Sequence, residues 1–193
     1  GIFTEFQEQR APGHTVLGKK MFRTGLLDLK REIEEAMAEL DMLDDPEGVD
    51  KHDELRAMEI VCDAMIMYAG RHADKLEELA AAEADPKRKS ELKQMAEVCR
   101  WVPAHAPRTV QEALQHYWFI HLGVVTELNP WDSFNPGRLD QSLYPLYEKQ
   151  IREGSATKED IYEVLESFWV KFNNHPSPPK VGVTAEESNT YTD

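Results

Sequence analysis

One segment limits the fold of this chain more than any other: residues 110–128 are apolar on every face of the helix that they predict. Its large apolar side chains are Leu114, Tyr117, Trp118, Phe119, Ile120, Leu122, Val124 and Val125. They leave no polar stripe that could face water, so the helix must be buried on all sides. A helical domain of 193 residues has difficulty surrounding such a helix, and we expect the chain to belong to a larger folded body.

The same segment is not expected to cross a membrane. Glu112, His116, His121 and Glu127 interrupt it, and no run of eighteen uncharged apolar residues occurs in the chain. The chain carries 22 basic and 36 acidic side chains, a formal net charge of −14. This excess of acids argues against a nucleic-acid groove and against an anionic membrane surface, because both recognise clustered Lys and Arg.

The cysteine content and the two ends of the chain indicate its cellular compartment and its relation to a longer polypeptide. With only Cys62 and Cys99, a disulfide scaffold and a cysteine-rich zinc module are excluded. No secretory leader is recognisable, which favours a cytosolic, reducing location. The chain starts with Gly1 rather than Met and stops at Asp193 as an extended segment begins, which we interpret as an excerpt of a longer polypeptide.

Hydrophobic periodicity predicts a mainly helical chain, with strand character only near its end. The expected helices cover residues 15–24 (with Gly25 as a C-terminal cap), 26–43, 53–84, 89–102, 109–127, 138–153 (broken at Pro145) and 157–174, and the expected strand covers 180–184. Thr109 with Glu112, and Thr157 with Asp160, have the spacing of helix-capping pairs. The stripe of the longest helix consists of Leu55, Met58, Cys62, Met65, Ala69, Ala73, Leu76 and Ala80.

A search for reactive motifs finds no phosphate-binding glycine loop, no GxSxG elbow and no HExxH. His116 and His121 are five residues apart and therefore lie on different helix faces, which makes them poor joint metal ligands. We interpret them as core or boundary histidines with satisfied hydrogen bonds. Cys62 and Cys99 lie in apolar stripes without a basic cluster and are interpreted as structural. No metal site is expected.

Two segments have the composition of a pocket wall. The loop at 129–138 combines aromatic rings (Trp131, Phe134), hydrogen-bonding side chains (Ser133, Asn135), the carboxylate of Asp132 and the guanidinium of Arg138. That mixture suits a pocket for a small polar molecule, although a rigid turn between helices uses similar residues. Near the N-terminus, Arg10 and His14 flank an Ala-Pro-Gly turn and could bind an anionic oxygen and a hydroxyl, or lie exposed.

With these segments in view, the sequence resembles the glycyl radical enzymes, the family of pyruvate formate-lyase and glycerol dehydratase. The segments that carry the resemblance are Arg10–Thr15 (RAPGHT), Ala96–Pro103 (AEVCRWVP), Pro107–Gln115 (PRTVQEALQ) and Pro136–Pro145 (PGRLDQSLYP). The last two are fairly specific for the family and less informative about the substrate.

The resemblance implies a fold and a radical mechanism. Residues 1–193 would be an internal segment of a pyruvate formate-lyase-like catalytic domain. They would form a helical part of its ten-stranded α/β barrel, with the first barrel strand or strands near the C-terminal end. A radical S-adenosylmethionine activase with an iron–sulfur cluster installs a glycyl radical, which passes to a cysteine whose thiyl takes hydrogen from substrate. Neither the loop of the radical glycine nor the loop of the radical cysteine is recognisable in this sequence, so no catalytic residue is expected in this segment.

The resemblance also assigns substrate contacts. A polar residue just before the Gly-Arg pair touches substrate in family members, which corresponds to Asn135, with Ser133 two residues earlier. The N-terminal turn does likewise in some members, which corresponds to His14, and Arg10 resembles the arginine that grips a sulfonate. The resulting substrate-binding set is Arg10, His14, Trp131, Ser133, Phe134 and Asn135.

The reaction subtype is less determined by the resemblance. Arg10 favours a carbon–sulfur lyase acting on a hydroxyalkanesulfonate, as in isethionate sulfite-lyase. In that type the partner four residues later is glutamine, whereas this chain has His14. A dehydratase, an arylacetate decarboxylase and a carbon–nitrogen lyase stay open, and so does a non-enzymatic helical interaction module. The resemblance further implies a small polar or anionic substrate, the activase as partner, a homodimer, and the cytoplasm of an anaerobe.

Overall fold

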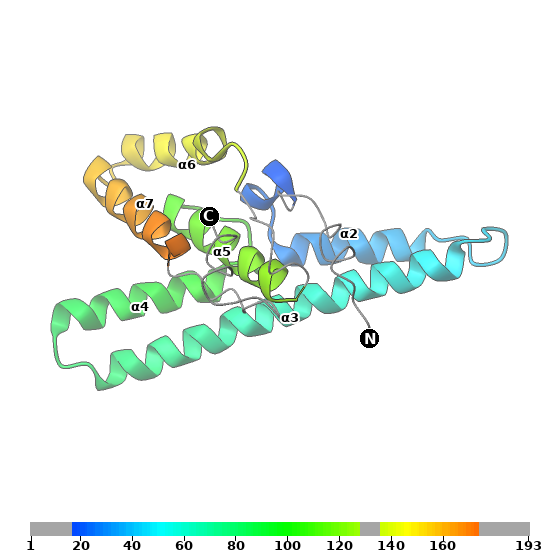
Figure 1. Ribbon diagram of the computed structural model, residues 1–193, viewed down its shortest axis with the longest axis horizontal. Helices are drawn as coiled ribbons and strands as arrows, with labels where there is room; N and C mark the ends of the chain where they lie inside the picture. Colours follow the sequence, from blue (N-terminus) through cyan, green and yellow to red (C-terminus); the bar gives the residue numbers. More distant parts are fainter. Residues whose placement is uncertain (1–16, 128–135, 174–193) are drawn as a thin grey trace, which may run out of the picture. The chain divides into compact units, whose positions relative to one another are not determined.

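The computed structural model describes residues 17–127 and 136–173, and within these ranges it contains six α-helices, one 3₁₀ helix and no strand. The elements are η1 (Gly18–Phe22), α2 (Leu26–Ala38), α3 (Gly48–Ala82), α4 (Pro86–Trp101), α5 (Val110–Glu127), α6 (Leu139–Glu153) and α7 (Lys158–Asn173) (Figure 1). The mainly helical prediction is confirmed. The strand predicted at 180–184 lies outside the described residues. No helix in the described ranges is long and apolar enough to span a bilayer.

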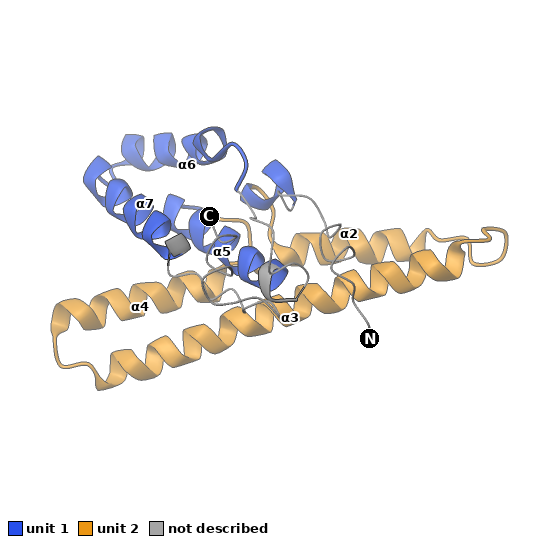
Figure 2. Cartoon of the chain, in the orientation of Figure 1, with its two compact units in different colours: residues 1–22, 108–193 blue, residues 23–107 orange. Residues whose placement is uncertain are grey.

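The chain divides into two compact units (Figure 2). One contains α2, α3 and α4, and the other contains η1, α5, α6 and α7. In the first unit, α2 packs along one part of α3 and α4 along another (Figure 1). Lys30 of α2 pairs with Asp63 of α3 at 2.6 Å, and Arg100 of α4 pairs with Asp74 and Glu77 of α3.

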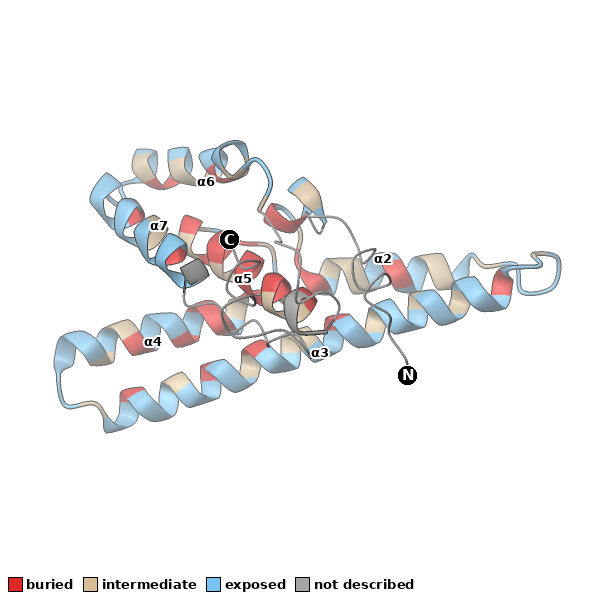
Figure 3. Ribbon diagram, viewed as in Figure 1, coloured by how far each residue is buried: buried red, intermediate tan, exposed pale blue. Residues whose placement is uncertain are grey.

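The packed face of α3 is narrower than the predicted stripe. Cys62, Ala69, Ala73 and Ala80 are buried, but Met58 is 52% exposed. The inward positions Leu55, Cys62, Ala69 and Leu76 recur at seven-residue steps, the period of two helices that pack along their length. Because α3 contacts α2 and α4 through one narrow face, residues on the opposite side of the helix, about half a turn round, face outward (Figure 3).

The start of α2 differs from the prediction. Gly25 is the N-cap of α2 rather than the end of a preceding helix, and within the described residues 17–24 only the short η1 forms. The carboxylate of Asp28 accepts a hydrogen bond from the backbone N–H of Gly25 at 3.0 Å. The helix ends at Ala38 rather than 43, because Asp41 accepts bonds from the backbone N–H groups of Leu43 and Asp44 and closes a turn there.

In the second unit, α5 supplies most of the buried side chains, as its sequence predicts (Figure 3). The helices α6 and α7 and the short η1 all contact it. The predicted break at Pro145 is wrong: α6 runs through it without interruption. Leu143 and Gln150 are buried on either side of the proline, so packing holds both halves in one helix. Gly154 ends α6 with a φ of +65°, as predicted.

Candidate functional site

The six predicted substrate-binding residues lie outside the described residues, so their role stays a prediction. They are Arg10, His14, Trp131, Ser133, Phe134 and Asn135. The structure instead describes the framework to which their two segments are attached. Both segments adjoin elements of the unit built around α5.

The N-terminal segment joins this framework through a left-handed turn. Leu17 and Gly18 have φ angles of +58° and +50°, a region that L-residues rarely occupy. Lys20 then donates its backbone N–H to the carbonyl of Leu17 at 3.0 Å, which closes the first turn of η1. Met21 and Phe22 are buried, and η1 contacts both α5 and α6.

The second segment lies between α5 and α6. Gly137, with a φ of +67°, turns the chain into α6, and Ser142 donates its backbone N–H to Arg138 at 3.0 Å. The guanidinium of Arg138 is exposed and lies 3.6 Å from the carboxylate of Asp140. Because α5, α6 and η1 contact one another, the attachment points of both predicted segments are held in one packed unit.

The first turn of α5 is fixed by part-buried and buried polar contacts. Thr109 Oγ1 accepts a hydrogen bond from the backbone N–H of Glu112 at 3.1 Å, as the capping pattern predicts. The carboxylate of Glu112 reaches past the cap and accepts from the backbone N–H of Arg108 at 2.6 Å and from its Nε at 3.1 Å and Nη2 at 2.5 Å. Gln150 of α6 accepts from the backbone N–H of Val110 at 2.8 Å.

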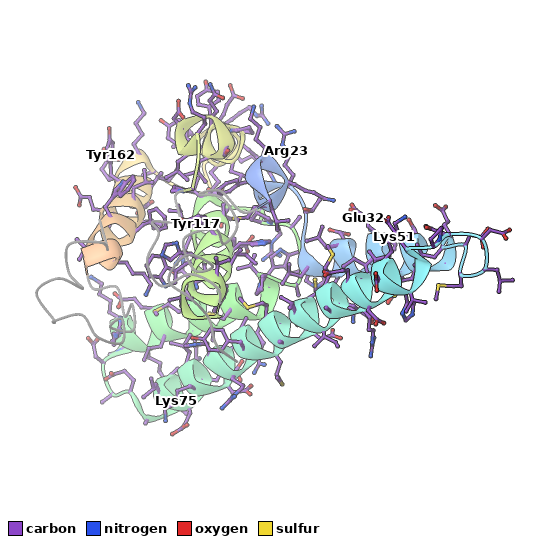
Figure 4. The ribbon with its side chains drawn as sticks, turned by 45° about the vertical axis from the view of Figure 1, so that its right-hand side comes forward. Arg23, Glu32, Lys51, Lys75, Tyr117 and Tyr162 are labelled. Carbon is purple, nitrogen blue, oxygen red and sulfur yellow. The ribbon has the colours of Figure 1, made fainter. Side chains whose placement is uncertain are left out.

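An aromatic cluster surrounds the second half of α5. The hydroxyl of Tyr117 lies 3.1 Å from Nδ1 of His121, and the Trp118 ring stacks on His121 at 4.9 Å between centroids. Phe168 of α7 meets Tyr117 edge-on at 5.7 Å. Burial raises the pKa of the Tyr117 hydroxyl, which keeps it neutral. Figure 4 shows Tyr117 on α5, whereas Tyr162 of α7 is 65% exposed.

The two histidines of α5 differ, which corrects the interpretation that both are satisfied. His121 has a partner in Tyr117, but His116 is 1% exposed and neither of its ring nitrogens has a hydrogen-bond partner. Burial lowers the pKa of His116 to about 4, so its imidazole is neutral at physiological pH. The described residues contain no group of three His, Cys, Asp or Glu side chains that could hold a metal ion.

Both cysteines are buried free thiols in the unit formed by α2, α3 and α4. Burial raises the pKa of the Cys99 thiol to about 11, and the pKa of Cys62 is also raised, first by burial. Neither therefore forms a thiolate readily, which is typical of a structural cysteine.

Residues 1–192 match the sequence family of pyruvate formate lyase-like proteins, which is nearly the whole chain. The chain belongs to this family of glycyl radical enzymes. The resemblance inferred from its motifs is thus confirmed. Membership of a lyase family whose enzymes carry a glycyl radical implies that cofactor for the complete protein.

Two relatives and one solved structure illustrate the relationship. The chain is 52% identical over 193 residues to trans-4-hydroxy-L-proline dehydratase of Clostridioides difficile, covering 100% of this chain and 24% of the relative. A crystal structure of hydroxyproline dehydratase from that organism, with trans-4-hydroxy-L-proline bound, superposes with a TM-score of 0.88 at 52% identity over 98% of this chain and 24% of that one. Isethionate sulfite-lyase of Oleidesulfovibrio alaskensis is 42% identical over 152 residues, 79% of this chain and 18% of the relative.

The chain thus spans about a quarter of the length of the dehydratase that it resembles. Within that quarter, its helices follow the corresponding part of a solved glycyl radical enzyme structure. This establishes the coarse form of the predicted fold: a mainly helical segment that matches part of such an enzyme.

Proposed function

We propose that the complete protein is a glycyl radical dehydratase that eliminates water from a small hydroxylated amino acid of the trans-4-hydroxy-L-proline type. The observation that carries this proposal is the 52% identity to the hydroxyproline dehydratase over the whole chain, against 42% to the sulfite-lyase over 152 residues. It favours carbon–oxygen cleavage over the carbon–sulfur cleavage that the sequence motifs favoured.

Leaving-group chemistry supports the same choice. Hydroxide is a poor leaving group, and its departure as water requires a proton from a nearby acid, whereas sulfite departs without one. An imidazole can supply that proton and an amide cannot. His14, at the position where glutamine is expected in the isethionate type, therefore suits a dehydratase, and we propose it as the group that hydrogen-bonds and protonates the leaving hydroxyl.

The other predicted contacts fit an amino acid as well as a sulfonate. A guanidinium binds a carboxylate through two parallel hydrogen bonds, so Arg10 is proposed to bind the carboxylate of the substrate. Trp131 and Phe134 are proposed to form apolar walls, with Ser133 and Asn135 as hydrogen-bonding groups. The contacts among η1, α5 and α6 support this assignment, because they hold the ends of both segments in one unit.

The remaining assignments follow from the family. We propose that this chain is an internal segment of the catalytic domain, and that a ten-stranded barrel, the radical glycine and the radical cysteine belong to the rest of the protein. A radical S-adenosylmethionine activase would install the glycyl radical, and the enzyme would act as a cytoplasmic homodimer under anaerobic conditions.

The test uses the full-length protein, activated without oxygen by a radical S-adenosylmethionine activase. The glycyl radical is quantified by electron paramagnetic resonance, and the enzyme is then given trans-4-hydroxy-L-proline or isethionate. Mass spectrometry should detect a product that is lighter by one water molecule from the first compound only. Release of sulfite from isethionate, with no change in hydroxyproline, would refute the proposal.

A histidine variant tests the role of His14 separately. His14→Ala should lower kcat by about a hundredfold or more, the usual effect of removing a general acid, at unchanged radical content. His52→Ala is the matched control, because the side chain of His52 on α3 is half-buried at the surface, with Nδ1 3.3 Å from the carboxylate of Asp53. Equal turnover in the two variants would remove His14 from the reaction.

A further inference from the structure

One side of the long helix α3 is exposed and yet rich in apolar side chains (Figure 3). Val61 on this side is 59% exposed and Met67 is 62% exposed. The stretch 57–68 contains two acids and no base, and both acids lie close to Lys30 of α2, at 2.6 and 3.8 Å. The outward side of this stretch is therefore uncharged, and exposed apolar patches of this kind mark contacts with another protein surface.

The exposed side contains a row of residues with the spacing of a helix-packing seam. Its members follow one another at alternating steps of four and three residues, as the a and d positions of a heptad do. All of them are exposed: Asp50, Glu54, Ala57, Val61, Ala64, Tyr68, Arg71 and Lys75. The buried residues Cys62 and Ala69 belong to a different side of the helix. Thus α3 carries a second row, which suits a further helix packed along its length.

Charge is ordered along this exposed row. Asp50 and Glu54 occupy its N-terminal end, Arg71 and Lys75 occupy its C-terminal end, and the four positions between them are uncharged. The order is complementary about a point midway between residues 62 and 63. Positions equally far from that point carry opposite charges near the ends and apolar side chains in the middle.

A second, antiparallel copy of α3 placed about that point would match every position of the row. The facing pairs, each formed twice, would be Asp50 with Lys75, Glu54 with Arg71, Ala57 with Tyr68, and Val61 with Ala64. Each acid would meet a base, and the ring of Tyr68 would meet the small side chain of Ala57. A two-fold symmetric interface requires a surface that is complementary to itself in this way.

We propose that the exposed row of α3 packs antiparallel against the same row of a second copy of this protein, with the two-fold axis beside residues 62 and 63. This inference rests on the homodimer proposed above and locates part of its interface. A helix from the rest of the same polypeptide would require only an apolar stripe on α3. It would not require the charges of α3 to match those of its own reversed sequence, so their order favours a second copy.

Cross-linking of the full-length protein tests the interface without radical or substrate. In the antiparallel pair, the two copies of residue 64 are offset along the helix by about 4.5 Å, and the two copies of residue 57 by about 16 Å. A short bismaleimide should therefore join Ala64→Cys to its own copy but not Ala57→Cys, as peptide mapping can show. Ala57 is the matched control because both residues are exposed alanines of the same row. Equal joining at both positions would indicate parallel helices and overturn the proposal.

Charge reversal tests the pairing itself. In the Ala64→Cys protein, Arg71→Glu should slow cross-linking about tenfold, because it brings two acids together near each end of the interface. Adding Glu54→Arg should restore the rate to within about threefold, because it recreates both pairs with the charges exchanged. Lys93→Glu, at an exposed position on α4, is the control and should leave the rate unchanged. A second change that fails to restore the rate would overturn the antiparallel register.

Light scattering separates a failure of this inference from a failure of the proposed homodimer. A dimer in which Ala64→Cys does not cross-link would have its interface elsewhere, which would overturn this inference alone. A monomer would overturn both. If the thiol at position 64 neither cross-links nor reacts with iodoacetamide, another part of the same polypeptide covers α3, and this result also contradicts the proposal.

Discussion

Gly25→Ala should loosen the junction between the start of α2 and the segment after α4. A Cβ atom at Gly25 would lie within 3.0 Å of three backbone atoms, the carbonyl oxygen of Ala104 and two atoms of His105. Backbone cannot rotate away as a side chain can, so either α2 or the segment at 103–105 must move. That movement would stretch two hydrogen bonds, from Leu26 N–H to the Pro103 carbonyl at 2.8 Å and from Leu27 N–H to the Ala104 carbonyl at 3.0 Å.

The expected cost follows from these contacts. Forcing an extra methyl group into a packed site costs roughly 1–3 kcal/mol. Each of the two backbone hydrogen bonds contributes about 1 kcal/mol. The sum is about 3–5 kcal/mol of local stability. Because about 1.4 kcal/mol corresponds to a factor of ten, the opening equilibrium should rise roughly a hundredfold to several thousandfold.

Hydrogen–deuterium exchange measured by mass spectrometry on the full-length protein can detect this change. Peptides that contain the Leu26 and Leu27 amides should exchange faster by that factor in Gly25→Ala. Gly70→Ala is the matched control: Gly70 lies within α3 with nothing within 4 Å of the added Cβ, and alanine there should stabilise the helix by about 0.5–1 kcal/mol. Exchange in Gly25→Ala within threefold of the parent protein would show that the junction is not packed in this way.

Three further outcomes follow from the contacts described. Thr157→Ala should cost about 1 kcal/mol and speed exchange in the first turn of α7, since Thr157 Oγ1 accepts from the backbone N–H of Asp160 at 3.1 Å; unchanged exchange would show that the cap is not formed. Burial lowers the pKa of His116 to about 4, against 6.5 in the unfolded chain, so between pH 6.5 and 4 the unfolded chain takes up a proton that the folded chain does not. The free energy of unfolding therefore falls with pH, by about 2 kcal/mol at pH 5. Urea titrations should show that His116→Gln removes this part of the pH dependence, and an unchanged dependence would assign it to another group. Cys99, with a pKa raised to about 11, should resist iodoacetamide at pH 8 in the native protein and react after unfolding, as peptide mapping can show; rapid native labelling would contradict its burial.

The helices were predictable because their signals are local. Apolar spacing places α3, α4, α5 and α7 within a few residues of their observed bounds, and the pairing of Thr157 with Asp160 marks the start of α7 correctly. The errors arise where contact with a segment distant in the sequence determines the local structure. Gly25 reads equally well as a helix end or a helix start, and what fixes it as a start is contact with residues 103–105, far away in the sequence.

For the candidate site, residue type identifies the candidate residues but does not identify the substrate. Arg10, His14 and the loop before Gly137 could be singled out because their side chains are of the kinds that bind small polar molecules. Arg10 does not distinguish sulfite from water as the leaving group, since a guanidinium binds a sulfonate or a carboxylate equally well. The choice of water is a proposal that rests on similarity along the whole chain.

The two histidines of α5 show why hydrogen-bond satisfaction cannot be predicted from a helical pattern. Each has a polar residue four positions earlier on the same face: Tyr117 for His121 and Glu112 for His116. The hydroxyl of Tyr117 lies 3.1 Å from Nδ1 of His121, so these two side chains pair directly. Glu112 instead turns toward Arg108 because the first turn of α5 leaves backbone N–H groups unpaired and an arginine precedes it. The capping of α5 therefore draws away the partner that spacing offers to His116, and this competition cannot be read from the spacing alone.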